Sequence, residues 1–313
     1  MKLKQAGERK VIELIKNSVR KTPLLKASFD NDAAVFKVGS RTIAVSTDMG
    51  LGSTHFTNQN AADMGKKIAV SNVSDLYCTG AEPFLCWVDF GCPKGWSMEF
   101  VRKLYQGLDG ELKKHGAFIA GGDTNESKEF VYSVAVLGEI KNKPLLRSTA
   151  KTGDCLVLSG PVGGAAAAYL AWKNKKQCPK QFKDAQERPA LNGALCKRIM
   201  KRANAGIDIS DGLARELNEI ARLSKKKLVV DWEKLPKPKG FEAYCEKQGW
   251  DAVDVAFNHG EDYQVVYSTP DRGKGNVFGR VLEARKPSDA GVWLLKDGKK
   301  IRIPSKGWEH FRN

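Results

Sequence analysis

The chain has 313 residues, of which 42% are hydrophobic and 28% are charged. This is the composition of an ordinary globular protein, and the length suffices for two domains with their own cores. No apolar run approaches the roughly 20 residues of a membrane-spanning helix, and the N-terminus lacks the apolar core of a signal peptide. The seven cysteines are scattered without a CxxC pair, which argues against a zinc site or a disulfide framework. We therefore predict a cytoplasmic protein with no membrane partner.

The formal net charge of +16 raises the hypothesis of a nucleic-acid partner. The excess is spread over lysine-rich stretches such as 173–176 and 225–227, which lack the interleaved aromatic residues of a single-strand-binding surface. The sequence also contains no zinc-finger or RNP pattern. A basic surface attracts small anionic substrates equally well. Because the nucleic-acid-binding motifs are missing, we predict no specific nucleic-acid partner.

Apolar periodicity and glycine or proline stops divide the first half into helices and strands. In chain order, the pattern predicts an amphipathic N-terminal helix, a hairpin of strands 33–38 and 41–47, a helix over 66–79, a strand over 84–90, a helix over 97–115, and strands over 117–120 and 130–140. Gly50, Gly52 and Ser53 predict a flexible loop that carries His55.

Residues 141–153 are basic and contain Pro144, which predicts a linker. We therefore expect two domains, residues 1–140 and residues 141–313, both of the α/β (α+β) class. In the second half the sequence predicts a strand over 155–159 leading into a helix, a polar surface loop over 173–189, a strand and helix from 205, a strand over 263–268, and a hairpin at 297–298.

Two glycine-containing turns in the second half each have two interpretations. The turn Gly160–Gly164 leads into a helix N-terminus, a place that often receives phosphate. It lacks the lysine of a P-loop and the spacing of a dinucleotide fingerprint, and glycine-rich turns between a strand and a helix are usually simple tight turns. Ser210 and Asp211 precede a helix, and either residue could serve only as its N-terminal cap.

The helix over 66–79 carries a carboxylate in an unusual setting. Its apolar residues form a surface broad enough for burial, and Ser71 and Asp75 share one face because they are four residues apart. A buried carboxylate is costly unless a cation, a metal or a hydrogen-bond donor meets it. Asp75 is therefore either a metal ligand or a structural acid that accepts from Ser71 or a nearby amide.

Other acids stand at similar places, at the ends of elements or beside glycine and serine. Each alone is a cap or turn residue, but together they form a hard oxygen-ligand set that suits Mg²⁺. Such a set suits the handling of polyphosphate, where magnesium neutralises the transferring group. The set consists of Asp32, Asp48, Asp75, Asp123, Asp208 and Asp211, with the hydroxyls of Ser46 and Thr47. The sequence has no Ser-His-Asp order and no HExxH motif.

Nine motifs follow the order of one enzyme family and span the chain. They are NDAAV at 31–35, STDM at 46–49, THF at 54–56, NVSDLYCTGAEP at 72–83, GGDT at 121–124, LRSTAKTGD at 146–154, IDISDGLARE at 207–216, GEDY at 260–263 and GWEHF at 307–311. On these motifs the chain resembles the thiamine-monophosphate kinases, of the aminoimidazole-ribonucleotide-synthetase-like superfamily. The resemblance implies a two-domain fold of that superfamily, with an N-terminal mixed sheet and helices followed by a C-terminal α/β domain.

The resemblance also implies an activity, which is phosphorylation of thiamine monophosphate by ATP to give thiamine diphosphate. It implies a homodimer in which the N-terminal domains share a sheet, and an ATP site between the domains. Three groups of residues match the family's functional positions. Those that match magnesium ligands are Asp32, Ser46, Thr47, Asp48, Asp75, Asp123, Asp208 and Asp211; those that match the nucleotide site are Gly122, Asp123, Arg147 and Ser210; those that match the thiamine-phosphate side are His55, Glu261 and Trp308.

We expect direct in-line transfer without a phosphoenzyme. The acceptor is a phosphate whose second pKa is about 6, so it is already anionic near neutral pH and needs no general base. The chain departs from the usual family pattern at Asp30-Asn31, in the GLGST segment at 50–54 and at His259. The alternatives are therefore another ATP-dependent member of the superfamily with a different acceptor, or a catalytically silent nucleotide-binding homologue.

Overall fold

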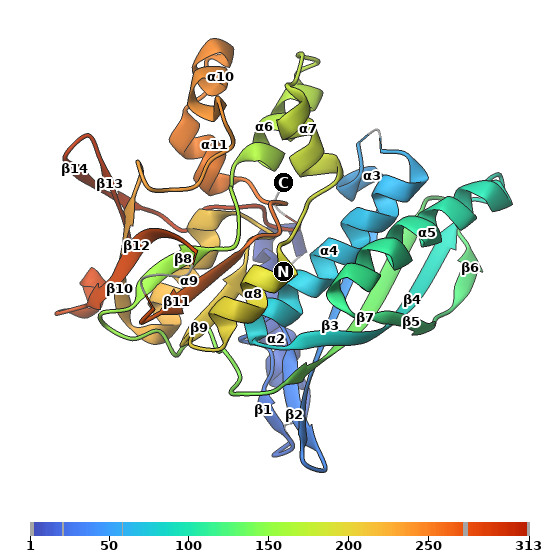
Figure 1. The fold of residues 1–313 in the computed structure, drawn as a ribbon, viewed down its shortest axis with the longest axis horizontal. Helices are drawn as coiled ribbons and strands as arrows, with labels where there is room; N and C mark the ends of the chain where they lie inside the picture. Colours follow the sequence, from blue (N-terminus) through green and yellow to red (C-terminus); the bar gives the residue numbers. More distant parts are fainter. Residues whose placement is uncertain (1–2, 21, 58, 272–274, 312–313) are drawn as a thin grey trace.

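The computed structural model describes residues 3–20, 22–57, 59–271 and 275–311, and Figure 1 shows their arrangement. The first half of the chain forms a seven-stranded mixed sheet in the order β1-β2-β3-β7-β4-β5, with β6 also paired to β4. Pairing is antiparallel except that β5 and β6 run parallel to β4. The strands are β1 (Leu25–Ala27), β2 (Ala34–Val38), β3 (Arg41–Leu51), β4 (Glu82–Cys92), β5 (Phe118–Gly121), β6 (Thr124–Glu126) and β7 (Val131–Ile140).

The second half forms another seven-stranded sheet, in the order β14-β13-β10-β12-β8-β11-β9. Only β10 and β13 are parallel neighbours within this sheet's described pairs. The strands are β8 (Cys155–Leu158), β9 (Ala205–Asp208), β10 (Lys226–Asp231), β11 (Val265–Thr269), β12 (Asn276–Glu283), β13 (Gly291–Lys296) and β14 (Lys299–Ile303). The predicted fold class, two α/β halves with a mixed first sheet, is confirmed.

Helices pack on and between the two sheets, as Figure 1 shows. The first half contains α1 (Leu3–Ala6), α2 (Glu8–Ser18), α3 (Gly52–His55), α4 (Ala61–Thr79) and α5 (Met98–His115). The second half contains α6 (Gly164–Lys173), α7 (Lys180–Glu187), α8 (Gly193–Met200), α9 (Leu213–Ser224), α10 (Phe241–Gln248), α11 (Ala252–Asn258) and the 3-10 turn η1 (Pro287–Asp289). No helix in the described part of the chain is long and apolar enough to cross a membrane.

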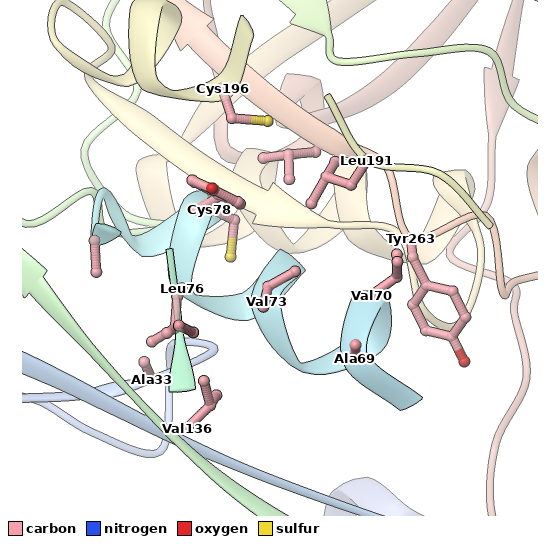
Figure 2. Packing of buried hydrophobic residues seen from close by; sticks show 14 of the residues in the cluster. Ala33, Ala69, Val70, Val73, Leu76, Cys78, Val136, Leu191, Cys196 and Tyr263 are labelled. Carbon is pink, nitrogen blue, oxygen red and sulfur yellow. The ribbon is translucent and has the colours of Figure 1, made fainter. Parts of the chain in front are cut away.

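Helix α4 lies at the centre and contacts both sheets. It packs on β3, β4 and β7 of the first sheet and on β9 and β11 of the second. In Figure 2, Leu76 of α4 lies beside Val136 of the first sheet, and Leu191 and Cys196 of the second half lie across the helix. A helix that contacts protein on every side must be apolar around most of its circumference. This explains the broad apolar surface of the sequence between residues 61 and 79.

The boundary between the two sheets coincides with the basic stretch that we predict as a linker. β7 ends at Ile140 and β8 begins at Cys155, with neither helix nor strand between them. We propose residues 1–140 and 141–313 as the two domains on this basis. Helix α4 lies within the first domain of the sequence, but its side chains pack against residues of both domains.

Two local predictions were wrong. Residues 50–55 do not form a flexible loop, because β3 continues to Leu51 through its pairing with β7 and α3 follows directly. Residues 173–189 are not a surface loop throughout, because α7 occupies Lys180–Glu187. The apolar anchor of α7 is Phe182, whose side chain is fully buried, and one aromatic residue in a polar stretch gives little periodic signal.

Helices α4 and α5 approach each other more closely than ordinary side chains allow. A Cβ atom added at Gly107 of α5 would lie 2.0 Å from the carbonyl oxygen of Ala62, whereas one added at Gly110 would meet nothing within 4 Å. Both glycines stand in the same helix, and Gly110 is exposed to solvent. The pair therefore separates the effect of packing from the effect of helix propensity.

We predict that Gly107→Ala lowers the free energy of unfolding by about 2 kcal/mol or more, because two backbones must move apart. Gly110→Ala should raise it by about 0.5–1 kcal/mol, because alanine favours the helix. Urea denaturation followed by circular dichroism measures both. Equal effects of the two substitutions would contradict the close packing of α4 on α5.

Candidate functional site

Four carboxylates converge where α4 passes between the two sheets. Asp75 projects from α4, Asp208 ends β9, Asp48 lies on β3, and Asp32 precedes β2. One oxygen each of Asp32 and Asp208 lies with the Cys78 sulfur in a group whose atoms are all within 4.8 Å of one another. The structure thus brings together four predicted metal ligands from four separate elements.

Two serine hydroxyls hold members of this cluster in place. The Ser46 Oγ donates to Asp75 Oδ2 at 2.6 Å, and the Ser74 Oγ donates to Asp208 Oδ2 at 2.8 Å. The bond from Ser46 supports the structural interpretation of Asp75 in part, although its donor is not Ser71. One neutral donor for each acid leaves the remaining carboxylate oxygens available to a cation.

Burial and crowding make the charged form of these acids unfavourable. Burial raises the pKa of Asp75 well above its ordinary value, and the carboxylates of Asp208 and Asp32 raise this pKa further. Burial likewise raises the pKa of Asp208, with Asp32 acting in the same direction. Burial raises the pKa of Asp48 above its ordinary value, and the nearby rings of His55 and His310 act against this rise. Acids in the state of Asp48, Asp75 and Asp208 call for additional positive charge nearby.

Arg147 supplies part of that charge. Its guanidinium donates to both carboxylate oxygens of Asp32, with a Nε–Oδ2 distance of 3.1 Å, and its backbone amide donates to Asn31 Oδ1 at 3.1 Å. Burial acts to lower the pKa of Arg147, but the charge of Asp32, the hydrogen bonds to Asp32 and the charge of Glu216 together raise it. The predicted nucleotide residue Arg147 is therefore fixed beside a predicted metal ligand.

Glu216 joins this group although we did not predict it. It lies in the first turn of α9, is 4% exposed, and has its pKa raised by burial, with Arg147 opposing the rise. In the sequence, an acid in the first turn of a helix is typical of a favourable interaction with the helix dipole. That common role hid the burial of Glu216 beside Asp208 and Asp211.

Ser210 and Asp211 do not cap α9, so the capping interpretation was wrong. Helix α9 begins at Leu213 after Gly212, which has a φ of 135° and no side-chain cap. Asp211 instead forms an ion pair with Arg215 at 3.0 Å. Burial raises the pKa of Asp211 to about 6, with Arg215 acting against the rise.

A cavity of about 510 Å³ opens beside the acid cluster and contains all three residues predicted for the thiamine-phosphate side. Asp48 and Asp211 line it together with His55, Glu261 and Trp308. A second, larger cavity of about 1110 Å³ is lined by the predicted nucleotide residues Arg147 and Ser210. Ser210 and Asp211 are among the residues that line both cavities, so the two cavities adjoin each other.

Three of the predicted site residues, Thr47, Gly122 and Asp123, lie away from the acid cluster of their own chain. Thr47 follows Ser46 on β3, so its side chain points to the opposite face of the sheet. Gly122 and Asp123 connect β5 to β6, and β5 is three strand positions from β3. At about 4.8 Å for each step, this places Asp123 about 14 Å from Asp48.

The glycine turn at 160–164 is occupied by an acid of the chain itself. The backbone amides of Gly163 and Ala165 donate to the two carboxylate oxygens of Asp262, at 2.9 and 3.4 Å. Asp262 therefore fills the position that a phosphate would take at the N-terminus of α6. Of the two interpretations, the structure supports the simple turn.

Comparisons with known proteins agree with this architecture. Residues 30–140 match the family model of the AIR synthase related protein, N-terminal domain, and residues 151–271 match the model of its C-terminal domain. The thiamine-monophosphate kinase of Pyrococcus horikoshii is 30% identical, over 91% of this chain and 93% of that one. This chain belongs to the thiamine-monophosphate kinase family. The enzyme of Methanopyrus kandleri is 34% identical over 93% of both chains.

Solved structures of the family have the same fold. The structure titled "AaThiL complexed with AMPPCP and TMP" matches with a TM-score of 0.86 at 29% identity, over 99% of both chains. A thiamine monophosphate kinase from Aquifex aeolicus matches with a TM-score of 0.82 at 28% identity, over 96% of this chain and 99% of that one. The hydrogenase maturation protein HypE in complex with ATP, at 20% identity and a TM-score of 0.68, over 95% of both chains, shares the fold.

The buried acid at the α6 terminus gives a pH-dependent contribution to stability. Burial raises the pKa of Asp262 to about 7, against 3.8 for a free side chain. Between these values the folded protein keeps a proton that the unfolded chain has lost. The free energy of unfolding therefore decreases as pH rises, with a contribution from this group of up to about 1.4 kcal/mol per pH unit.

We predict that Asp262→Asn removes this contribution. The free energy of unfolding of the variant should therefore fall less steeply between about pH 4 and pH 7 than that of the wild type. Urea unfolding at a series of pH values in that range measures the difference. Parallel stability curves for the two proteins would show that Asp262 titrates at its ordinary value.

Proposed function

We propose that this protein transfers the terminal phosphoryl group of ATP to thiamine monophosphate and so forms thiamine diphosphate. The observation that carries the proposal is that the two cavities adjoin beside the four-acid cluster and share Ser210 and Asp211 in their linings. A donor in the larger cavity and an acceptor in the smaller one would meet at the cluster. The relative AaThiL, whose solved structure is complexed with AMPPCP and TMP, supports these two ligands.

We propose Mg²⁺ as the cation of the cluster. Asp32, Asp48, Asp75 and Asp208 offer hard oxygen donors, and burial raises the pKa of Asp75 and Asp208, so a bound cation would stabilise their charged forms. Asp211 stands at the edge of the same group. When bound, magnesium would neutralise charge on the polyphosphate during transfer.

The side chains of the two cavities would position the substrates. Arg147 and Ser210 line the larger cavity and would hold the nucleotide. Trp308 offers an aromatic face to the cationic ring of thiamine, and its backbone amide donates to the Asp211 carbonyl at 2.9 Å. His55 and Glu261 would contact the acceptor from the opposite wall. The acceptor phosphate is anionic near neutral pH, so transfer would proceed in line, without a general base or a phosphoenzyme.

We further propose a homodimer in which the first sheets pair. The face of this sheet opposite α4 carries exposed apolar side chains, with Met49 62% exposed and Phe118 66% exposed. A second copy would bury this face. It would also bring its own Gly122 and Asp123 to the site of the first copy, from which these residues are distant within one chain.

We propose that the reaction takes place in the cytoplasm, where ATP is available to the enzyme.

We predict that Asp75→Asn and Asp123→Asn each lose activity by about 10³-fold or more, because each removes a charge that stabilises the transferring group. ADP release measures turnover, and circular dichroism checks the fold. Asp109→Asn, which changes an exposed acid on α5, is the control and should keep wild-type activity.

Mixing the two inactive variants tests the shared site. After refolding together, half of the dimers contain one copy of each variant, and each of these has one intact site. About a quarter of the wild-type activity should therefore return if Asp123 acts in the partner's site. No recovery from the mixture would place Asp75 and Asp123 in the same chain's site or exclude the dimer.

A further inference from the structure

Lys67 of α4 carries a buried positive charge that the proposed reaction does not use. Its side chain is 3% exposed, and it lies one and two helical turns before Ser71 and Asp75. A buried ammonium is unfavourable unless it is paired and hydrogen-bonded. The groups that pair with the Lys67 ammonium therefore indicate the role of this residue.

Both partners belong to the thiamine-phosphate side of the candidate site. The Lys67 Nζ donates to the backbone carbonyl of His55 at 2.9 Å and lies 3.1 Å from Glu261 Oε1. His55 ends α3 beside the first sheet, whereas Glu261 precedes β11 of the second sheet. One ammonium thus joins two walls of the smaller cavity that come from distant parts of the chain.

Glu261 occupies a backbone conformation that needs support. Its φ of 66° is in the left-handed region, which is unfavourable for a residue with a side chain. Its amide donates to the Ser210 carbonyl at 2.8 Å, and a Cβ at the preceding Gly260 would lie 1.8 Å from that oxygen. The backbone is therefore fixed at one point, and the ion pair with Lys67 fixes the direction of the carboxylate.

Helix α4 sets the distance between this contact and the acid cluster. Lys67, Ser71 and Asp75 are spaced by four residues and share one face of the helix. Eight residues of α helix span about 12 Å, so the ammonium and the Asp75 carboxylate stand at a fixed separation on one rigid element. Movement of Lys67 would change the position of the acceptor side relative to the metal side.

We propose that Lys67 is a positioning residue that holds His55 and Glu261 at the right distance from the acid cluster for binding of thiamine monophosphate. The inference rests on the proposed function, because it concerns the acceptor of that reaction. Lys67 acts through these two residues and does not itself line the cavity.

The test compares Lys67→Met, which keeps the length of the side chain and removes its charge, with the wild type. The KM for thiamine monophosphate should rise about tenfold, while the KM for ATP should stay within about twofold. Isothermal titration with thiamine monophosphate in the absence of ATP should show the same loss of affinity. An unchanged KM for the acceptor, with only a lower melting temperature, would reduce Lys67 to a structural brace and overturn the proposal.

Lys197→Met is the matched control. Lys197 of α8 forms a 3.2 Å ion pair with Glu82 of β4, which also joins the two halves of the chain, but neither residue lines the smaller cavity. This variant should keep both KM values. A rise in its acceptor KM equal to that of Lys67→Met would show that any contact between the halves has this effect, and would contradict the specific role of Lys67.

A double variant keeps the test possible if Lys67→Met fails to fold. Lys67→Met with Glu261→Gln leaves no unpaired buried charge, and its acceptor KM is compared with that of Glu261→Gln alone. Because the two residues act through one contact, the acceptor KM of the double variant should lie within about threefold of that of Glu261→Gln alone. An acceptor KM about tenfold above that of Glu261→Gln would overturn the proposal. Failure of the wild type to use thiamine monophosphate would instead refute the proposed function.

Discussion

Electrostatic repulsion among buried carboxylates is the constraint on which the rest of this structure depends. Asp75 and Asp208 lie in a protein interior where the charged form is unfavourable, and the charge of Asp32 raises the cost for both. A protein would gain stability by replacing such acids with neutral residues. Their presence at the junction of two cavities is best explained by a cation that binds there, and polyphosphate chemistry provides the reason for that cation.

The fold meets this constraint by placing one helix between two sheets. α4 buries apolar residues against both sheets and carries Asp75 on the stripe that also bears Lys67. Acids from other elements, among them Asp32 and Asp208, approach this stripe from either side. The same helix therefore supports the core, the negative cluster and the acceptor wall. Small changes on α4 should affect stability and activity together, which is why matched control variants matter.

Much of this organisation could be predicted from the sequence. The buried helix with Asp75 follows from its apolar breadth, and the hairpin at Gly39-Ser40 from its alternation. Glu216 could not be found in this way, because an acid in the first turn of a helix has a more common role. Helix α7 was missed because Phe182 alone marks its buried face. The separation of Asp123 from the cluster depends on strand order, which local patterns do not specify.

The measurement that tests the central claim most directly is ADP release from ATP and Mg²⁺ with a set of acceptors. Thiamine monophosphate is compared with free thiamine and with aminoimidazole precursors, and the product is identified by chromatography. Our account predicts ADP and thiamine diphosphate with thiamine monophosphate alone. ATP binding without turnover, or turnover with a different acceptor, would contradict it and direct attention to the segments at Asp30-Asn31 and 50–54.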